Sequence, residues 1–211
     1  GAGGRAGALK MIDVARAASP RRVRIFLAEK GISIPFEPLS LLKLEHRSEA
    51  VRRLNPFAQV PILVLDDGST LSESVAICRY FEELQPEPAL LGRDARQKAD
   101  IEMWNRRIEL GLFHAVAHCF RHTHPAMAVM EQPQIAAWGD VNRGRVGEVL
   151  ALIDGQLAVR AHVAGADFSI ADITLLVAVD FMKPAKIDRP MGLSNLERWY
   201  KEVSARPSAK A

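Results

Sequence analysis

The sequence predicts an α/β domain followed by an all-helical domain. Up to residue 84, short apolar runs of strand length alternate with segments whose apolar residues recur at helical spacing. After residue 94 only helical spacing is found. Between these parts, Gln85-Pro86-Glu87-Pro88 has the composition of a linker. We therefore expect domains at residues 8–84 and 95–206, joined by a linker at residues 85–94.

The composition of the 211 residues is that of an ordinary globular protein, with 48% hydrophobic and 25% charged residues. The net charge of +3 is spread along the chain, so neither a nucleic-acid partner nor a membrane partner is expected. No apolar run reaches transmembrane length, and no signal peptide is recognisable. Cys78 and Cys119 form neither a disulfide framework nor a metal motif, which favours a reducing, cytoplasmic location. The Gly- and Ala-rich residues 1–7 are excluded from the fold prediction.

The first part of the chain predicts the order strand, helix, strand, helix, strand, strand, helix. Ser19-Pro20 suits the N-cap and first position of the first helix, and Gly31 suits the position just past its end. The expected elements up to the linker are a strand at 9–13, a loop at 14–18, an extended region at 32–42 and a short helix at 45–54, with Val51 and Leu54 inward.

Residues Asn55–Ser74 form the most informative stretch of the sequence. Pro61 opens an apolar run of strand length, and Asp66-Asp67-Gly68 is typical of a hairpin turn. Helical spacing resumes after Ser72-Glu73-Ser74, where Ser72 would be an N-cap and Glu73 a favourable acid in the first turn. The unit is therefore a loop, a strand, a turn, a strand and a helix.

The second part of the chain predicts helices only. One long helix is expected from Arg96 to His122, and another from Pro133 to Val159. Ser169 and Asp172 form a capping box that opens a third helix, with Asp in place of the usual Glu. A last amphipathic helix is expected at 193–205, with Trp199 facing inward, followed by a polar tail at 206–211.

The stretch Asn55-Pro56-Phe57-Ala58-Gln59-Val60-Pro61, with the hairpin and Glu73-Ser74, resembles the glutathione-binding half-site of the cytosolic glutathione transferases. The resemblance covers nearly the whole chain and includes features of the phi, zeta and beta classes. It implies a thioredoxin-like N-terminal domain followed by an all-α C-terminal domain. It also implies a bacterial-type cytosolic homodimer that adds glutathione thiolate to a hydrophobic electrophile, as in detoxification, with glutathione as co-substrate and no metal.

The resemblance also assigns residues to the parts of glutathione. The family's proline at Pro61 is cis, which turns the Val60 backbone toward the cysteinyl group. Ser74 at a helix start suits the γ-glutamyl carboxylate, and Glu73 suits the ammonium group. Glu45-His46-Arg47 resembles the phi-class pattern Glu-His-Lys, which holds the glycyl carboxylate, and Gln59 matches another phi-class contact. The expected contacts are therefore His46, Arg47, Gln59, Val60, Pro61, Glu73 and Ser74.

The thiolate form of glutathione is the nucleophile in this family, so some group must stabilise it. Ser19 is the only hydroxyl in the loop after the first strand, and it occupies the position of the cysteine in the bacterial cysteine-type classes. The position of the family's catalytic serine is Ala17, which has no donor. Either Ser19 donates to the sulfur, or backbone N–H groups and the helix dipole stabilise it and Ser19 is only an N-cap. Arg21, Arg22 and Arg24 add positive potential from largely solvated positions.

The long helix at 96–122 contains two further candidate sites. The resemblance assigns this helix to the electrophile pocket and suggests Met103, Trp104 and Arg107, although packing in the core or an interface explains Met103 and Trp104 equally well. His114, His118 and His122 are four residues apart, with Cys119 and His124 nearby. Without a visible acidic ligand, we expect no metal site there.

Two other functions are compatible with the same fold. A non-catalytic protein that binds glutathione or hydrophobic ligands is favoured by the alanine at position 17. A glutathione-dependent isomerase or peroxidase is the other alternative. A thiol-disulfide oxidoreductase is disfavoured because the loop after the first strand contains no cysteine.

Overall fold

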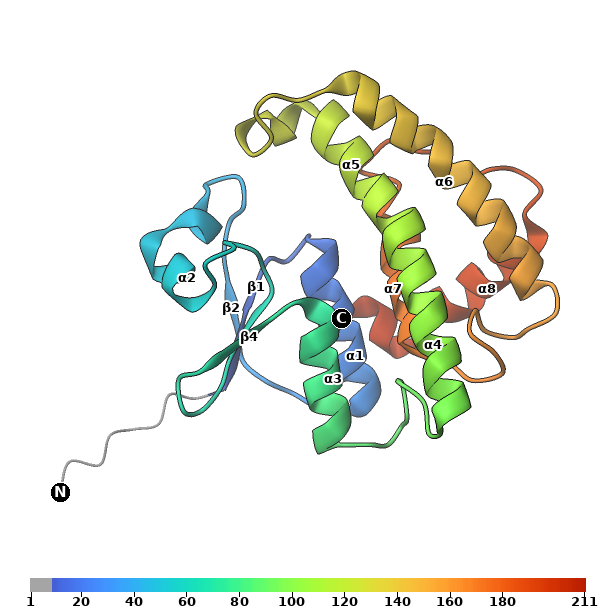
Figure 1. The fold of residues 1–211 in the computed structure, drawn as a ribbon, viewed down its shortest axis with the longest axis horizontal. Helices are drawn as coiled ribbons and strands as arrows, with labels where there is room; N and C mark the ends of the chain where they lie inside the picture. Colours follow the sequence, from blue (N-terminus) through green and yellow to red (C-terminus); the bar gives the residue numbers. More distant parts are fainter. Residues whose placement is uncertain (1–8) are drawn as a thin grey trace. The chain divides into compact units, whose positions relative to one another are not determined.

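The structure, a computed structural model, describes residues 9–211, so the excluded segment 1–7 lies outside the described residues. The chain forms two compact units that divide between Pro86 and Glu87, inside the predicted linker. The first unit combines strands and helices, and the second is helical (Figure 1). The predicted fold class is therefore confirmed: a thioredoxin-like unit is followed by an all-helical one.

Four short strands form the sheet of the first unit in the order β2-β1-β3-β4. β1 pairs in parallel with β2, whereas β3 is antiparallel to both of its neighbours. In this register Ile12 of β1 lies opposite Ile62 of β3, which lies opposite Ser72 of β4. The strands are β1 (Lys10–Asp13), β2 (Phe36–Pro38), β3 (Ile62–Val64) and β4 (Thr70–Ser72).

Helices cover both faces of this sheet. Because side chains alternate along a strand, Ile12, Ile62 and Val64 share one face, where they form a buried cluster with Val51 of α2 (Glu49–Leu54). Leu54 packs partly buried against the same cluster, as predicted. Helices α1 (Ala18–Lys30) and α3 (Ser74–Leu84) contact each other and lie on the other side of the sheet (Figure 1).

The start of α1 differs from the prediction. The N-cap is Ala17, and Ser19-Pro20 lies inside the first helical turn, so Ser19 is not the N-cap. Proline is tolerated there because the first N–H groups of a helix have no partner within the helix. The prediction for the other end is confirmed: Gly31 has φ 67°, a left-handed conformation that glycine adopts without steric cost.

Two further elements are shorter than predicted. The extended region at 32–42 contains only the three residues of β2, which ends at Pro38, a residue with no N–H to donate. The helix at 45–54 is divided into a 3₁₀ turn, η1 (Glu45–Arg47), and α2. Ser48 causes the division because its hydroxyl accepts a hydrogen bond from the Val51 N–H at 3.3 Å and caps a new helix.

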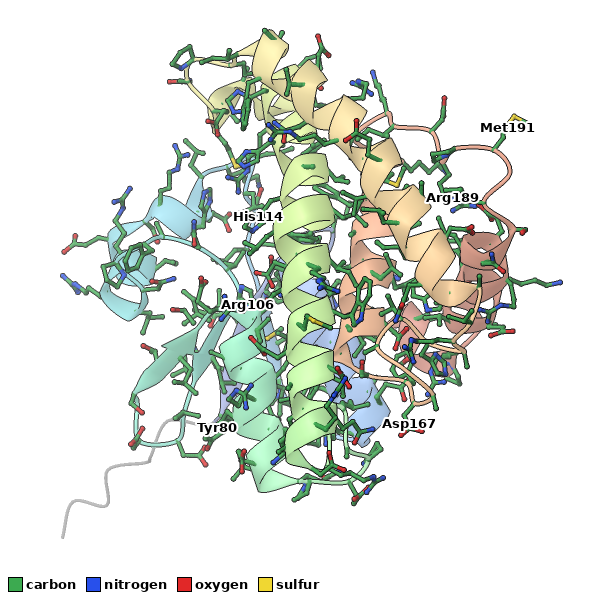
Figure 2. The ribbon with its side chains drawn as sticks, turned by 45° about the vertical axis from the view of Figure 1, so that its right-hand side comes forward. Tyr80, Arg106, His114, Asp167, Arg189 and Met191 are labelled. Carbon is green, nitrogen blue, oxygen red and sulfur yellow. The ribbon has the colours of Figure 1, made fainter. Side chains whose placement is uncertain are left out.

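The second unit is built around one long helical rod. Figure 2 shows this rod, on which Arg106 and His114 are labelled. It confirms the predicted long helix, with the addition of one π-helical segment, η2, in its middle. Within residues 9–211, none of the helices combines the length and apolar character needed to cross a membrane. The helices are α4 (Ala95–Ile108), η2 (Glu109–Phe113), α5 (His114–Thr123), η3 (Pro125–Val129), α6 (Ala136–Leu157), α7 (Ile170–Phe181), α8 (Ser194–Ser204) and η4 (Pro207–Lys210).

The predicted capping box at the start of α7 is confirmed. The Ser169 hydroxyl accepts from the first turn of the helix, and Asp172 accepts from the Ser169 N–H at 3.0 Å. Trp199 is fully buried as predicted, and its indole N–H donates to Asp172 at 2.8 Å. The predicted polar tail contains the 3₁₀ turn η4.

Candidate glutathione site

One edge of the sheet gathers three of the predicted site segments. Ile12, Ile62 and Ser72 are register partners near the end of β1, the start of β3 and the end of β4. The loop that leads from β1 to Ser19, the Val60-Pro61 pair before β3, and Glu73-Ser74 after β4 therefore all leave the sheet at the same edge. Segments far apart in the sequence are brought together by strand pairing alone.

Asn55 organises the loop that precedes β3. The residue is only 4% exposed; its amide N–H donates to the Gln59 carbonyl at 3.0 Å, and its amide oxygen accepts from the Phe57 N–H at 3.1 Å. This support holds Ala58 at φ 53°, an unusual value for a residue other than glycine. Asn55 was predicted only as part of the family pattern, and its supporting role agrees with the tendency of asparagine to hydrogen-bond the backbone of such turns.

The Val60-Pro61 peptide bond is cis, as predicted. Pro61 is buried, and β3 begins at Ile62. Within residues 9–211 the Val60 N–H and C=O have no hydrogen-bond partner, so both groups remain available to a ligand. Gln59, next to this pair, is exposed at the surface.

Glu73 has a backbone conformation that few residues adopt. Its φ of 70° and ψ of 115° place it outside the regions favoured by residues with a side chain, and such positions are concentrated at functional sites. Glu73 rather than Ser72 is the N-cap of α3, so the simpler interpretation of Ser72 as a helix cap is wrong. The Glu73 side chain is exposed and makes no capping bond.

Ser74 is 93% buried and is held by an arginine from another helix. Arg22 Nη1 of α1 donates to the Ser74 hydroxyl at 3.0 Å. The prediction that Arg22 is solvated is wrong: only 1% of its surface is exposed, because its side chain lies between the packed helices α1 and α3. Arg24 is also largely buried, in an ion pair with Asp13.

Ser19 lies half-buried in the first turn of α1. Its hydroxyl has no hydrogen-bond partner within residues 9–211, and no side chain caps the helix. The backbone N–H groups of Ala18 and Ser19 therefore point from an uncapped helix N-terminus, where an anion is favoured. Both predicted sources of thiolate stabilisation, the Ser19 hydroxyl and the backbone N–H groups, are thus present at the same helix start.

His46 and Arg47 lie on η1, outside the strands, so strand pairing does not bring them to the same edge as the other predicted site segments. His46 is 93% buried and Arg47 is exposed, so the two side chains are in different environments. Glu45 stabilises this loop, because its carboxylate accepts from the Ser40 N–H at 3.0 Å. Binding of the glycyl carboxylate by His46 and Arg47 stays a prediction.

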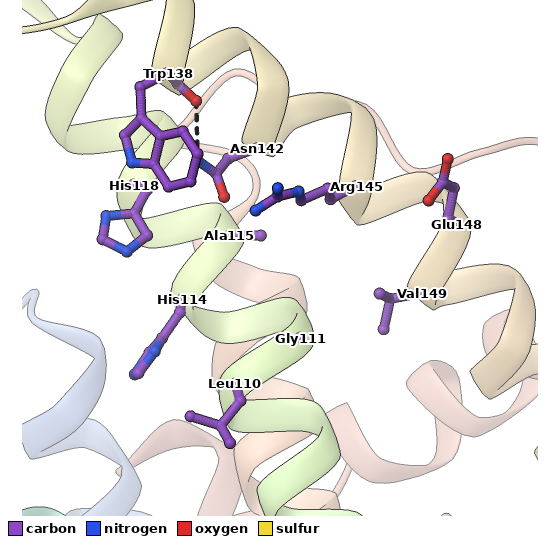
Figure 3. A pocket seen from close by; sticks show the side chains of 10 residues that line it. All are labelled: Leu110, Gly111, His114, Ala115, His118, Trp138, Asn142, Arg145, Glu148 and Val149. Atoms are coloured by element: carbon purple, nitrogen blue, oxygen red, sulfur yellow. Dashed lines mark hydrogen bonds between the residues drawn. The ribbon is translucent and has the colours of Figure 1, made fainter.

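The second unit contains a cavity of about 460 Å³ between the η2–α5 segment and α6 (Figure 3). Trp138 lines it and is 39% exposed, with the Arg145 guanidinium 5.2 Å and the His118 ring 5.8 Å from its ring. Burial, together with His114 and other nearby cations, lowers the pKa of His118. Met103, Trp104 and Arg107 are not among the residues that line this cavity; Arg107 lies 4.9 Å over the Trp104 ring instead.

His122 in the last turn of α5 and His124, its C-cap residue, are engaged in other contacts. Nδ1 of His122 accepts from the Ile135 N–H at 3.0 Å, and Nδ1 of His124 accepts from the Ala126 N–H at 3.1 Å. Within residues 9–211, no three or more His, Cys, Asp or Glu side chains are grouped so that they could hold a metal ion.

Ser19, Val60-Pro61 and Glu73-Ser74 together form the sheet-edge site. The fold and this site define a thioredoxin-like protein with an added helical domain. Family models give the particular assignment: "Glutathione S-transferase, N-terminal domain" matches residues 18–84, and "Glutathione S-transferase, C-terminal domain" matches residues 115–207. The chain is 37% identical over 194 residues to glutathione S-transferase 2 of Saccharomyces cerevisiae, covering 90% of this chain and 83% of that relative. The chain therefore belongs to the glutathione S-transferase family.

Solved structures agree with this assignment. A glutathione S-transferase domain-containing protein from Marinobacter aquaeolei matches with a TM-score of 0.91 and 37% identity, over 94% of this chain and 98% of that one. A shorter similarity, 42% identity over 93 residues, links 43% of this chain to 44% of the maleylacetoacetate isomerase of Pseudomonas aeruginosa. Transferase activity with glutathione as co-substrate follows from the family.

Proposed function

We propose that this protein conjugates glutathione to hydrophobic electrophiles, using the sheet-edge site to bind the tripeptide. The observation that carries the proposal is the register that places Ser19, Val60-Pro61 and Glu73-Ser74 at one edge. Val60 would pair with the cysteinyl backbone, and Glu73 and Ser74 with the γ-glutamyl ammonium and carboxylate. His46, Arg47 and Gln59 would bind the rest of the tripeptide.

In this reaction the thiolate sulfur forms a bond to an electrophilic carbon, and a leaving group such as chloride takes the electron pair of the broken bond. Met103, Trp104 and Arg107 are proposed contacts for the electrophile, and the cavity beside Trp138 offers an aromatic surface in the same unit. We also propose that the protein is a cytoplasmic homodimer with a role in detoxification, and sedimentation of the purified protein tests the dimer.

The first prediction concerns the γ-glutamyl contacts. Glu73→Ala and Ser74→Ala are each expected to weaken glutathione binding by about 1–3 kcal/mol, the range of a hydrogen bond to a charged group. Calorimetric titration measures the affinity, and circular dichroism confirms that the variants are folded. Glu83→Ala, an exposed acid on the same helix, is the matched control and should bind as the wild type does. Unchanged affinity in both test variants would refute the site.

The second prediction concerns the thiolate. If the Ser19 hydroxyl donates to the sulfur, Ser19→Ala should raise the pKa of bound glutathione by about one to two units, because such a bond contributes about 1.5–3 kcal/mol. Ser19→Asp should raise it further by charge repulsion, whereas Ser19→Thr keeps the hydroxyl. Stability should not change in Ser19→Ala, because Ser19 is not the N-cap. Thiolate absorbance against pH is the measurement; equal values in all four proteins would leave the backbone N–H groups as the source.

The alternative functions are separated by one paired experiment. Glutathione is titrated against intrinsic tryptophan fluorescence, and conjugation of a chloronitrobenzene is assayed in parallel. Binding with turnover supports the transferase. Binding without turnover supports a ligand-binding protein, which the absence of a side-chain donor at Ala17 favours. Isomerisation of a cis-enone substrate without conjugation would support the isomerase, which the similarity over 93 residues favours.

A further inference from the structure

Arg22 is a buried cation, although its position on a helix between other arginines predicts a solvated side chain. It lies on α1, is 1% exposed, and faces Ser74 on α3. A buried guanidinium is costly to desolvate unless hydrogen bonds and charges compensate. An arginine on a helix normally keeps its guanidinium group in water. The burial of Arg22 against Ser74 therefore suggests that it has a role there.

The hydrogen bond between Arg22 and Ser74 has a fixed direction. A guanidinium has only donors, so the Ser74 hydroxyl must accept through a lone pair. Ser74 makes no other hydrogen bond through its side chain within residues 9–211. The hydroxyl proton is therefore free to be donated, and it cannot be turned toward Arg22. A hydroxyl held in this way is oriented as a donor, which suits an anion and not a cation.

The surroundings of Ser74 favour a negative charge as well. Ser74 is the first residue of α3, an eleven-residue helix with no side-chain cap. The positive end of the helix dipole and the first N–H groups of α3 therefore lie beside the Ser74 hydroxyl. The positive charge of Arg22 also acts on a second group on the buried side of α3. Burial raises the pKa of Cys78, one turn further on, to about 12, and Arg22 acts in the opposite direction.

We propose that Arg22 is a positioning residue for glutathione, orienting the Ser74 hydroxyl as a donor to the γ-glutamyl carboxylate. Arg22 does not itself touch the tripeptide; it acts through Ser74. The inference rests on the proposed function, since it concerns the same site. Its distinctive consequence is selectivity: loss of Arg22 should matter only for ligands that carry this carboxylate.

Two analogues of glutathione separate the groups at this end of the ligand. 4-Aminobutyryl-Cys-Gly lacks the γ-glutamyl carboxylate and keeps the amine, whereas glutaryl-Cys-Gly keeps the carboxylate and lacks the amine. Calorimetry gives the affinity of each ligand for wild type, Arg22→Met, Ser74→Ala and the double variant. Arg79→Met, an exposed arginine on α3, is the matched control. Arg22→Lys, which keeps a buried cation, is measured if Arg22→Met does not fold.

Arg22→Met should bind glutathione and glutaryl-Cys-Gly about 10-fold to 100-fold more weakly, with no change for 4-aminobutyryl-Cys-Gly. The double variant should bind no more weakly than Ser74→Ala, and Arg79→Met should match the wild type. Arg22→Lys should show a smaller loss that is confined to the same two ligands. Equal losses for all three ligands, or additive losses in the double variant, would overturn the role of Arg22 alone. A wild-type protein that binds no glutathione would overturn the proposed function with it.

Discussion

Asp172→Ala is expected to lower the free energy of unfolding by about 3–6 kcal/mol, because three buried N–H donors lose their acceptor at once. Asp172 is fully buried and accepts from the Val163 N–H at 3.0 Å, the Ser169 N–H at 3.0 Å and the Trp199 indole N–H at 2.8 Å. Each donor left unpaired in the interior costs about 1–3 kcal/mol, and the helix also loses its capping box. Urea unfolding followed by circular dichroism measures the change.

A matched control tests whether burial, and not capping alone, is responsible. Asp94 caps α4 by accepting from the Gln97 N–H at 2.8 Å, but it is exposed. Asp94→Ala should therefore cost only about 0.5–2 kcal/mol, the usual value for an N-cap. Trp199→Phe removes one of the three donors and should make a subsequent Asp172→Ala less costly. Equal costs for Asp172→Ala and Asp94→Ala would contradict the proposed network.

Glu82→Ala is expected to destabilise the protein by about 3–5 kcal/mol, because it leaves the buried ammonium group of Lys30 without its counter-charge. The side chain of Lys30 is fully buried and that of Glu82 is 11% exposed, and the two form an ion pair between α1 and α3. Lys30 also donates to the Gln85 carbonyl at 2.7 Å, and the Gln85 amide donates back to the Lys30 carbonyl at 2.5 Å. The ends of the two helices are thus joined by charge and by hydrogen bonds.

The exposed ion pair between Arg53 and Glu49 provides the comparison. Their side chains are 75% and 80% exposed, so Glu49→Ala should change stability by about 0–1 kcal/mol. The double variant Lys30→Met/Glu82→Leu should recover most of the loss, since replacing both members of a buried pair by apolar residues is often neutral or stabilising. A loss below about 1 kcal/mol in Glu82→Ala would show that the pair is not effectively buried.

Helices α1 and α3 are joined at two places. Arg22 of α1 contacts α3 near its start, where the candidate site lies, and Lys30 of α1 contacts α3 near its end. The Lys30 contact concerns stability. The Arg22 contact concerns the orientation of Ser74, so the two can be told apart by experiment. Glu82→Ala should weaken folding without changing the relative affinities for the two glutathione analogues.

Local signals determined the fold class from the sequence. The proline-bracketed loop, the Asp-Asp-Gly turn, the Ser169–Asp172 capping box and Gly31 each act within a few residues, so their consequences can be derived without knowing the rest of the chain. The candidate segments Val60-Pro61 and Glu73-Ser74 were identified from the resemblance to the glutathione transferases, because local signals alone predicted only a strand start and a helix start there. Their gathering at one edge then follows from strand order and register.

The tertiary structure decided which side chains are buried and what they contact. Arg22 meets Ser74, and Lys30 meets Glu82, across 52 residues of sequence, and no local pattern predicts which arginine or lysine of a helix turns inward. The strained backbone of Glu73 and the unpaired backbone of Val60 are likewise fixed by neighbouring elements. Burial, hydrogen-bond direction and charge pairing depend on distances between distant segments, and only packing of the helices on the sheet sets those distances.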